Sequence, residues 1–226
     1  MPMKFVLNAE NAKRLDRLIR TTKSNSITID SSASAMMVLL LSPDSSHYTT
    51  LRLEPEFFEQ MEPGPKAVSL LRVHFYEPNM RRVTVMATSE CATLRFEFSD
   101  AASVRAFPNE PLEVFDIEFV PERLIRFNFQ KIRKALRHFK GKIAKFEFGR
   151  QLLITGDEMS IRVDEPIEGA QISVVLDTVK LRAILSVVDM FEDSFVGFTD
   201  NESPLNLVFR GPDIFMNTFI SIEDDY

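Results

Sequence analysis

Cysteine is almost absent from this 226-residue chain, which has Cys91 alone. An internal disulfide is therefore excluded, and the sequence fits a reducing compartment such as the cytosol or the nucleus. No window approaches eighteen uninterrupted apolar residues, and the N-terminus lacks the basic-then-apolar pattern of a signal peptide, so we expect neither membrane insertion nor secretion. The apolar content of 45% predicts a soluble globular protein with one large or two ordinary domains.

Side chains that perform catalysis are also scarce. His47, His74 and His138 are isolated in the sequence, and none stands at metal-ligand spacing from Cys91 or from another histidine. The seven glycines are scattered and form no phosphate-binding loop, and no serine has the context of a nucleophile elbow. The sequence therefore predicts no enzyme, no metal site and no cofactor.

Strand patterns dominate what is present. Most of these segments alternate polar with apolar residues, which predicts antiparallel sheets with one buried face and one wet face. The expected strands are 3–7, 26–29, 36–41, 47–53, 82–87, 92–98, 124–127, 143–148, 151–155, 159–163, 171–176, 194–199, 205–209 and 215–222.

Helices are few, and they follow strands directly. Asn8, Asn128 and Asp177 are predicted N-caps, because each ends a strand pattern and offers a side-chain oxygen to the first helical turn. A further helix is expected over 66–75, after the breaker at 63–65. Four entries from strand into helix indicate a fourfold internal quasi-repeat, with two units in each half of the chain.

Two of these helices carry segregated charge. Segment 128–142 has six basic side chains and no carboxylate, over an apolar stripe at helical spacing, in a chain of net charge -6. Segment 9–23 repeats the arrangement more weakly. Solvated helices usually mix both signs, so a one-sided cationic face favours sequence-independent contact with the phosphates of duplex DNA. The predicted DNA contacts are Lys13, Arg14, Arg17, Arg20, Lys131, Arg133, Lys134, Arg137 and Lys140.

A proline-containing, acidic stretch divides the chain. Residues 108–121 contain three prolines, with carboxylates and apolar side chains interleaved, which predicts an extended connector lying on the surface of a domain. We therefore expect one domain over 1–107, the connector over 108–121, and a second domain over 122–226.

These features together resemble a known family, the sliding DNA clamps, which include proliferating cell nuclear antigen and its checkpoint relatives. The resemblance is carried by the strand start at 3–7, the run Asp44-Ser45-Ser46-His47, the connector, the basic helices, and the endings at 203–209 and 219–222. The paired Phe57 and Phe58 after Pro55 resemble the Rad-nine type subunit of the nine-one-one checkpoint clamp. Compared with most clamp subunits, the chain is shorter around 66–83.

The resemblance implies an α+β fold with two similar domains, each with antiparallel sheets outside and two helices inside. It also implies a nuclear, non-enzymatic subunit of a heterotrimer with two paralogous clamp subunits, which encircles duplex DNA and has no membrane partner. A clamp loader and repair or signalling proteins would bind through the connector groove. In such a ring, the edge strands near 103–107 and 171–176 would pair with neighbouring subunits, since an unpaired edge is otherwise a liability. The groove residues that it implies are Met37, Leu39, His47, Leu112, Val114, Phe115, Ile117 and Leu205.

Two alternatives remain open from the sequence. The first is a homotrimeric replicative clamp that acts as a polymerase processivity factor. The second belongs to another class, an adaptor that binds acidic peptides through its basic helices. Size measurement of the purified chain separates the two clamps, and binding to DNA or to an acidic peptide separates a clamp from an adaptor.

Overall fold

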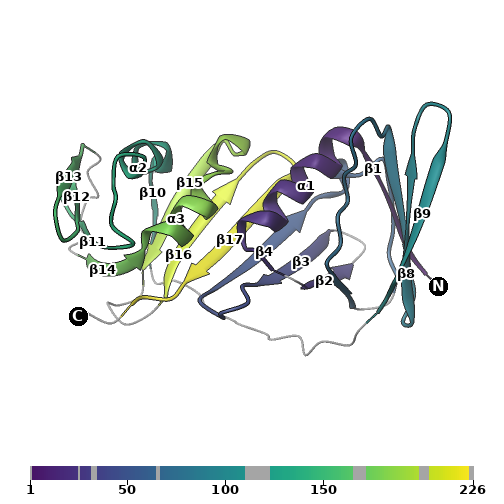
Figure 1. The fold of residues 1–226 in the computed structure, drawn as a ribbon, viewed down its shortest axis with the longest axis horizontal. Helices are drawn as coiled ribbons and strands as arrows, with labels where there is room; N and C mark the ends of the chain where they lie inside the picture. Colours follow the sequence, from purple (N-terminus) through teal and green to yellow (C-terminus); the bar gives the residue numbers. More distant parts are fainter. Residues whose placement is uncertain are drawn as a thin grey trace. The chain divides into compact units, whose positions relative to one another are not determined.

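Antiparallel β-sheets and a few α-helices make up the protein (Figure 1). The computed structural model describes residues 2–24, 26–31, 35–64, 67–109, 123–164, 172–198 and 204–223. The chain divides into two units, Met1–Ile117 with Asp213–Met216, and Glu118–Pro212 with Asn217–Tyr226. The α+β class with antiparallel sheets is confirmed.

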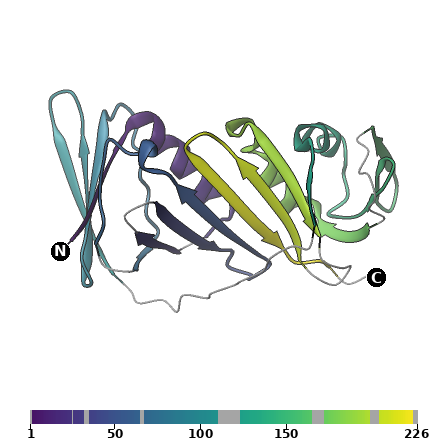
Figure 2. The ribbon, with the colours of Figure 1, turned by 180° about the vertical axis from the view of Figure 1, so that it is seen from behind.

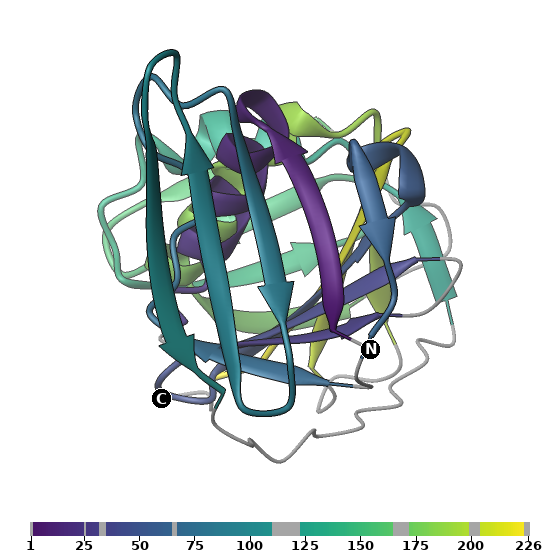
Figure 3. The same cartoon turned by 90° about the vertical axis from the view of Figure 1, so that its right-hand side faces the viewer.

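The first unit contains two sets of paired strands and one α-helix. Its elements are β1 (Met3–Asn8), α1 (Ala9–Thr21), β2 (Ser26–Ser31), β3 (Met36–Leu41), β4 (His47–Leu53), the 3₁₀ turn η1 (Pro55–Phe57), β5 (Gln60–Glu62), β6 (Val68–Leu71), β7 (Arg82–Ala87), β8 (Cys91–Glu97) and β9 (Ala102–Pro108). One sheet has the order β5-β1-β7-β8-β9, and β4-β3-β2-β6 follow one another in a second. Figure 3 faces the first sheet, with α1 behind it.

The second unit repeats the theme with two helices. Its elements are β10 (Arg123–Arg126), α2 (Phe129–Leu136), β11 (Ile143–Phe148), β12 (Leu152–Thr155), β13 (Ser160–Val163), β14 (Ile172–Asp177), α3 (Thr178–Leu185), the 3₁₀ turn η2 (Val188–Met190), β15 (Asp193–Phe198) and β16 (Leu205–Arg210). Strand β17 (Ile214–Ile220) begins in the first unit and ends in the second. One sheet has the order β13-β12-β11-β14, and β10 pairs with β15, which pairs with β16.

Helices cover one face of the strands in each unit. Figure 2, seen from behind, shows β2, β3 and β4 in front of α1, and β15 and β16 in front of α3. Helix α1 turns the buried side chains of Ala12, Leu15, Leu18 and Ile19 inward. This apolar stripe is the one that the helical periodicity predicts.

Phenylalanine supplies the large core side chains, because the sequence has no tryptophan. Phe5 and Phe58 meet edge to face with ring centroids 5.6 Å apart in the first unit. Phe127 and Phe129 do the same at 5.0 Å in the second. Such edge-to-face pairs add to the hydrophobic gain of burial, so each unit has an aromatic core of its own.

The helix expected over 66–75 is wrong. Residues 68–71 form strand β6, which pairs with β2 in the register Ile27↔Leu70, and the chain then turns at Arg72, whose φ is 49°. Burial in the sheet overrides the weak helical pattern. Unit 1 therefore has α1 as its one α-helix in the described residues, where two were predicted. Gly64, which precedes β6, passes close to the start of β1, because a Cβ there would lie 2.2 Å from the Met3 backbone nitrogen.

Candidate nucleic-acid interface

Helix α1 presents basic side chains opposite its buried stripe. Asn8 caps the helix, with its side-chain oxygen accepting a hydrogen bond from the Asn11 amide at 2.8 Å, which confirms the predicted N-cap. Lys13, Arg17 and Arg20 are exposed on the outer face. They form a cationic ridge that begins one turn after the N-terminus of the helix.

Arg14 is turned inward and bound within its own unit. Its two terminal nitrogens donate to both carboxylate oxygens of Asp213 at 2.7 and 2.8 Å, and its guanidinium lies 5.2 Å from the centre of the Phe57 ring. The hydrogen bond from Arg14 holds the pKa of Asp213 below its ordinary value, against the opposing effect of burial. We therefore remove Arg14 from the predicted DNA contacts and assign it a structural role.

Helix α2 is shorter than the sequence predicted. Asn128 caps it as expected, accepting from the Gln130 amide at 3.1 Å, but the helix ends at Leu136 and not near Lys142. Arg182 of α3 closes this end, with Nε donating to the Leu136 carbonyl at 3.0 Å and another nitrogen donating to the Phe139 carbonyl. Cations at the C-terminal end of a helix also interact favourably with its dipole. Because the helix ends at Leu136, Lys140 lies in the segment that follows it, where its side chain is exposed.

The predicted contacts on α2 differ in how they are held. Lys134 and Arg137 are exposed. Arg133 is only partly exposed and lies 3.5 Å from an Asp189 carboxylate oxygen, while Lys131 is exposed and its Nζ donates to the Asp164 carbonyl at 2.7 Å. Lys134 on the helix and Arg137 at its C-cap are thus the cations most accessible to DNA here.

Helix α3 brings further basic side chains that the sequence analysis did not assign to the site. Asp177 caps it, as predicted, by accepting from the amides of Val179 and Lys180 at 2.7 and 3.1 Å. Lys180 lies 3.5 Å from Glu223, and Arg182 is engaged at the end of α2. The cations of α3 are thus bound by a carboxylate and by backbone carbonyl oxygens. They contribute more to packing than to an exposed basic surface.

The residues predicted for a partner groove do not share one face. Met37 and Leu39 are half-buried on one face of β3. His47 is buried with Thr49 and Leu51 on the opposite face of β4, because alternate strand residues point to opposite sides of a sheet. Leu205 is 2% exposed in β16 of the second unit. Leu112, Val114, Phe115 and Ile117 lie outside the described residues.

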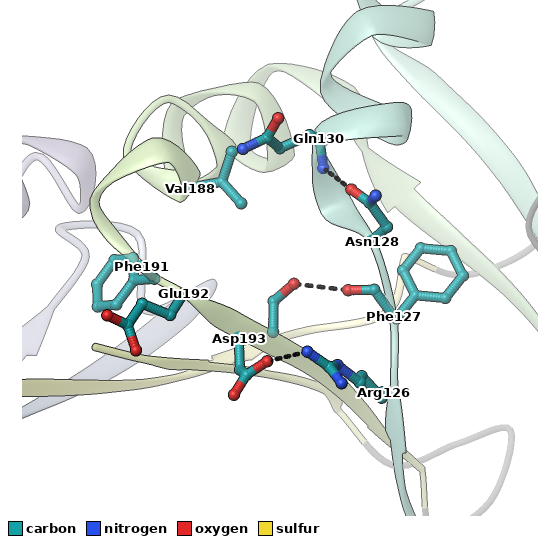
Figure 4. A pocket seen from close by; sticks show the side chains of 9 residues that line it. Arg126, Phe127, Asn128, Gln130, Val188, Phe191, Glu192 and Asp193 are labelled. Carbon is teal, nitrogen blue, oxygen red and sulfur yellow. Dashed lines mark hydrogen bonds and ion pairs between the residues drawn. The ribbon is translucent and has the colours of Figure 1, made fainter. Parts of the chain in front are cut away.

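A cavity of about 400 Å³ lies in the second unit among β10, α2, η2 and β15 (Figure 4). It is lined by Arg126, Phe127, Asn128, Gln130, Val188, Phe191, Glu192, Asp193 and Ser194. Arg126 pairs with Asp193, and the Ser194 hydroxyl donates to the Phe127 carbonyl at 2.6 Å. The lining contains no histidine or cysteine, and its serine is engaged by backbone, so it offers no paired nucleophile and base.

Within the described part of the chain, no group of three or more His, Cys, Asp or Glu side chains is placed to hold a metal ion. None of the helices there is long and apolar enough to cross a membrane.

Solved structures of clamps share this architecture. The chain is similar to PCNA from Thermococcus kodakaraensis, with a TM-score of 0.77 and 13% identity over 98% of this chain and 100% of that one. It is similar to proliferating cellular nuclear antigen from Entamoeba histolytica, with a TM-score of 0.75 and 12% identity over 98% and 99% of the two chains. It also resembles a chain of the PCNA2–PCNA3 complex from Sulfolobus tokodaii, with a TM-score of 0.74 and 14% identity over 98% and 99%.

At the level of sequence, no family model matches the chain, and no curated protein matches it. The structural likeness therefore stands on the path of the backbone over nearly the whole chain. The protein has the fold of the PCNA-like sliding clamps.

Proposed function

We propose that this protein is a non-enzymatic subunit of a ring-shaped clamp that encircles duplex DNA. The observation that carries the proposal is a set of exposed cations on a helix of each unit of a clamp fold. These are Lys13, Arg17 and Arg20 on α1 of the first unit, and Lys134 and Arg137 on and just after α2 of the second. Phosphate contacts are blind to sequence and sensitive to salt. Weak contacts of this kind hold a closed ring on DNA and still let it slide.

Ring assembly through open strand edges completes the proposal. In the described residues no strand pairs with the outer side of β9 or of β13, which end their sheets. The interface strand predicted at 171–176 is less suitable, because the Val175 carbonyl at the outer edge of β14 already accepts the Glu223 amide at 2.9 Å. We therefore assign β9 of one subunit and β13 of the next to the ring joint.

The ring that we propose is the heterotrimeric checkpoint clamp of the nucleus, with this chain as its Rad-nine type subunit. The support is the sequence resemblance around Phe57 and Phe58, whose rings pack edge to face at 5.6 Å in the core of the first unit. Partner peptides would bind the Met37 and Leu39 face of β3 together with connector residues 112–120. A clamp loader would place the ring on DNA.

Size measurement tests the kind of ring. We expect the purified chain to behave as a monomer in size-exclusion chromatography with light scattering, and to form a trimer only with two different clamp subunits copurified from its own cells. A stable homotrimer of the chain alone would contradict this assignment and support the replicative clamp.

The DNA contact is tested by neutralising the exposed cations of the second unit. For Lys134→Gln with Arg137→Gln, the slope of log affinity against log salt should become shallower by about 1.8, because each of the two phosphate contacts removed accounts for about 0.9. The measurement is fluorescence anisotropy of a labelled duplex over about 50 to 200 mM salt. Lys145→Gln with Arg150→Gln removes the same charge from β11 and the turn that follows it, away from α2 and from the proposed ring joint, and is the control. Equal slopes for all three proteins would contradict the proposed DNA surface.

A further inference from the structure

An irregular segment, residues 72–76, stands where a second helix of the first unit was predicted. Its side chains alternate, with Val73 and Phe75 buried, Arg72 and His74 exposed, and Tyr76 half-buried. Phe75 is 0% exposed and packs with its ring centroid 6.2 Å from that of Phe5. The apolar side of the segment therefore belongs to the core, and its other side faces outward.

Asp16 fastens this segment to α1. It is 4% exposed, and its Oδ1 accepts a hydrogen bond from the Phe75 amide at 2.6 Å. Its Oδ2 accepts from Arg20 at 3.1 Å and lies 3.8 Å from the His74 ring nitrogen Nδ1. A carboxylate on a basic helix thus joins a backbone amide of the segment to two exposed basic side chains.

The outward side of the segment is continuous with the cationic ridge of α1. The Lys13 ammonium lies 5.8 Å from the centre of the Tyr76 ring, and His74 meets Arg20 at Asp16. Arg72 is exposed at the turn that begins the segment, where its φ is 49°. The next carboxylate, Glu77, is paired with Arg105 of β9, so its charge is neutralised.

We propose that residues 72–76 form the second half of the DNA-contacting surface of the first unit, and that Asp16 is the positioning residue that holds them there. The proposal rests on the proposed function and deepens it. A single helix and one irregular segment take the place of the predicted pair of helices, and Arg72 supplies a phosphate contact in addition to those of Arg17 and Arg20. The partner is the backbone of duplex DNA, which a row of separated cations recognises without reading bases.

Arg72→Gln tests the contact directly, because Arg72 is exposed and its replacement leaves the core unchanged. The salt slope for a labelled random-sequence duplex should become shallower by about 0.9, equal to one phosphate contact. Arg17→Gln on α1 is the positive reference. Arg95→Gln is the negative control, because Arg95 is 60% exposed on the face of β8 that points away from α1.

The positioning role is tested by two variants of equal charge. Asp16→Asn keeps an oxygen that accepts the Phe75 amide, whereas Asp16→Ala removes it. Charge alone predicts that both variants bind DNA more tightly than wild type. Positioning predicts instead that Asp16→Ala has a salt slope shallower than that of Asp16→Asn by about 0.9, because Arg72 is then no longer held against a phosphate. Thermal unfolding shows whether both variants are folded.

The outcomes separate this inference from the proposed function. Reduced slopes for Arg17→Gln and Arg72→Gln, with Asp16→Asn binding better than Asp16→Ala, support the inference. A reduced slope for Arg17→Gln with an unchanged slope for Arg72→Gln overturns it and leaves the clamp proposal standing. Equal slopes for Asp16→Asn and Asp16→Ala overturn the role of Asp16. If Asp16→Ala does not fold, the comparison of Arg72→Gln with Arg95→Gln decides. Unchanged salt slopes for both Arg17→Gln and the double variant Lys134→Gln with Arg137→Gln contradict both proposals.

Discussion

Val104→Pro is expected to stop this subunit from joining its neighbours while leaving it folded. Two hydrogen bonds at the ends of the β8–β9 ladder identify which residue pairs along it are hydrogen-bonded. The Phe98 amide donates to the Ala101 carbonyl, and the Asn109 amide donates to the Glu90 carbonyl, each at 2.9 Å. Bonded pairs alternate along an antiparallel ladder, so residues 103, 105 and 107 bond to β8 and the amide of residue 104 points outward. Proline is tolerated at such edge positions.

The measurement is recovery of the other ring subunits with tagged protein from its own cells, or loss of self-assembly if the chain is a homotrimer. Val104→Thr keeps the outward amide and should assemble like wild type. Arg105→Pro removes an amide that bonds to β8 and should lower stability, which checks the phase of the ladder. Normal assembly of Val104→Pro would rule out β9 as the joint.

The complementary edge has an equivalent position. On β13 the Gly156 amide donates to the Met159 carbonyl at 2.9 Å, which places the amide of Arg162 on the outer side. Arg162→Pro is therefore expected to produce the same loss of assembly as Val104→Pro.

Asp213→Asn is expected to lower the free energy of unfolding by about 2 kcal/mol at neutral pH, because it weakens a charge-assisted, two-pronged hydrogen bond with Arg14. The Arg14 and Asp213 side chains are only 23% and 16% exposed. Urea unfolding followed by circular dichroism measures the difference. A double-mutant cycle with Arg14→Met isolates the pair from other effects of each substitution. Additive effects in that cycle would contradict the coupling.

The pH dependence of this difference has a defined sign. Arg14 lowers the pKa of Asp213 below its ordinary value of 3.8, so the unfolded chain binds the proton more readily than the folded one. The stabilisation is present above about pH 4 and is lost as the pH falls through the lower folded pKa. Wild type and Asp213→Asn should therefore converge in acid.

Asp16 provides an internal comparison of opposite sign. Burial raises its pKa above 3.8, against the lowering effects of the Phe75 amide and Arg20. Its contribution to stability is therefore fully present below about pH 4 and is lost as the pH rises through the raised folded pKa. The stability of Asp16→Asn relative to wild type should rise over that range, in contrast to the fall for Asp213→Asn.

Local signals in the sequence predicted much of the fold correctly. Asn8, Asn128 and Asp177 were identified as N-caps because a polar residue ends a strand pattern directly before an apolar-periodic run, and all three accept hydrogen bonds from the following turn. The buried stripe of α1 followed from the helical period. These signals work because the groups that satisfy them lie within a few residues of one another.

Other predictions failed where a distant residue intervenes. The end of α2 at Leu136 depends on Arg182 of another helix. The strand at 68–71 depends on pairing with β2, in the register Ile27↔Leu70. The inward turn of Arg14 depends on Asp213, 199 residues later.

Charge segregation, strand periodicity and capping residues are properties of neighbouring amino acids, and they were sufficient to predict antiparallel sheets with few helices, two of them basic. Which of those cations face outward is a different matter. Arg14 and Lys13 are adjacent in the sequence, yet one is bound to a carboxylate and the other extends over a tyrosine ring. A cation turns inward only where the fold supplies a fixed anion or carbonyl that compensates for its lost hydration, and that partner comes from a distant part of the chain.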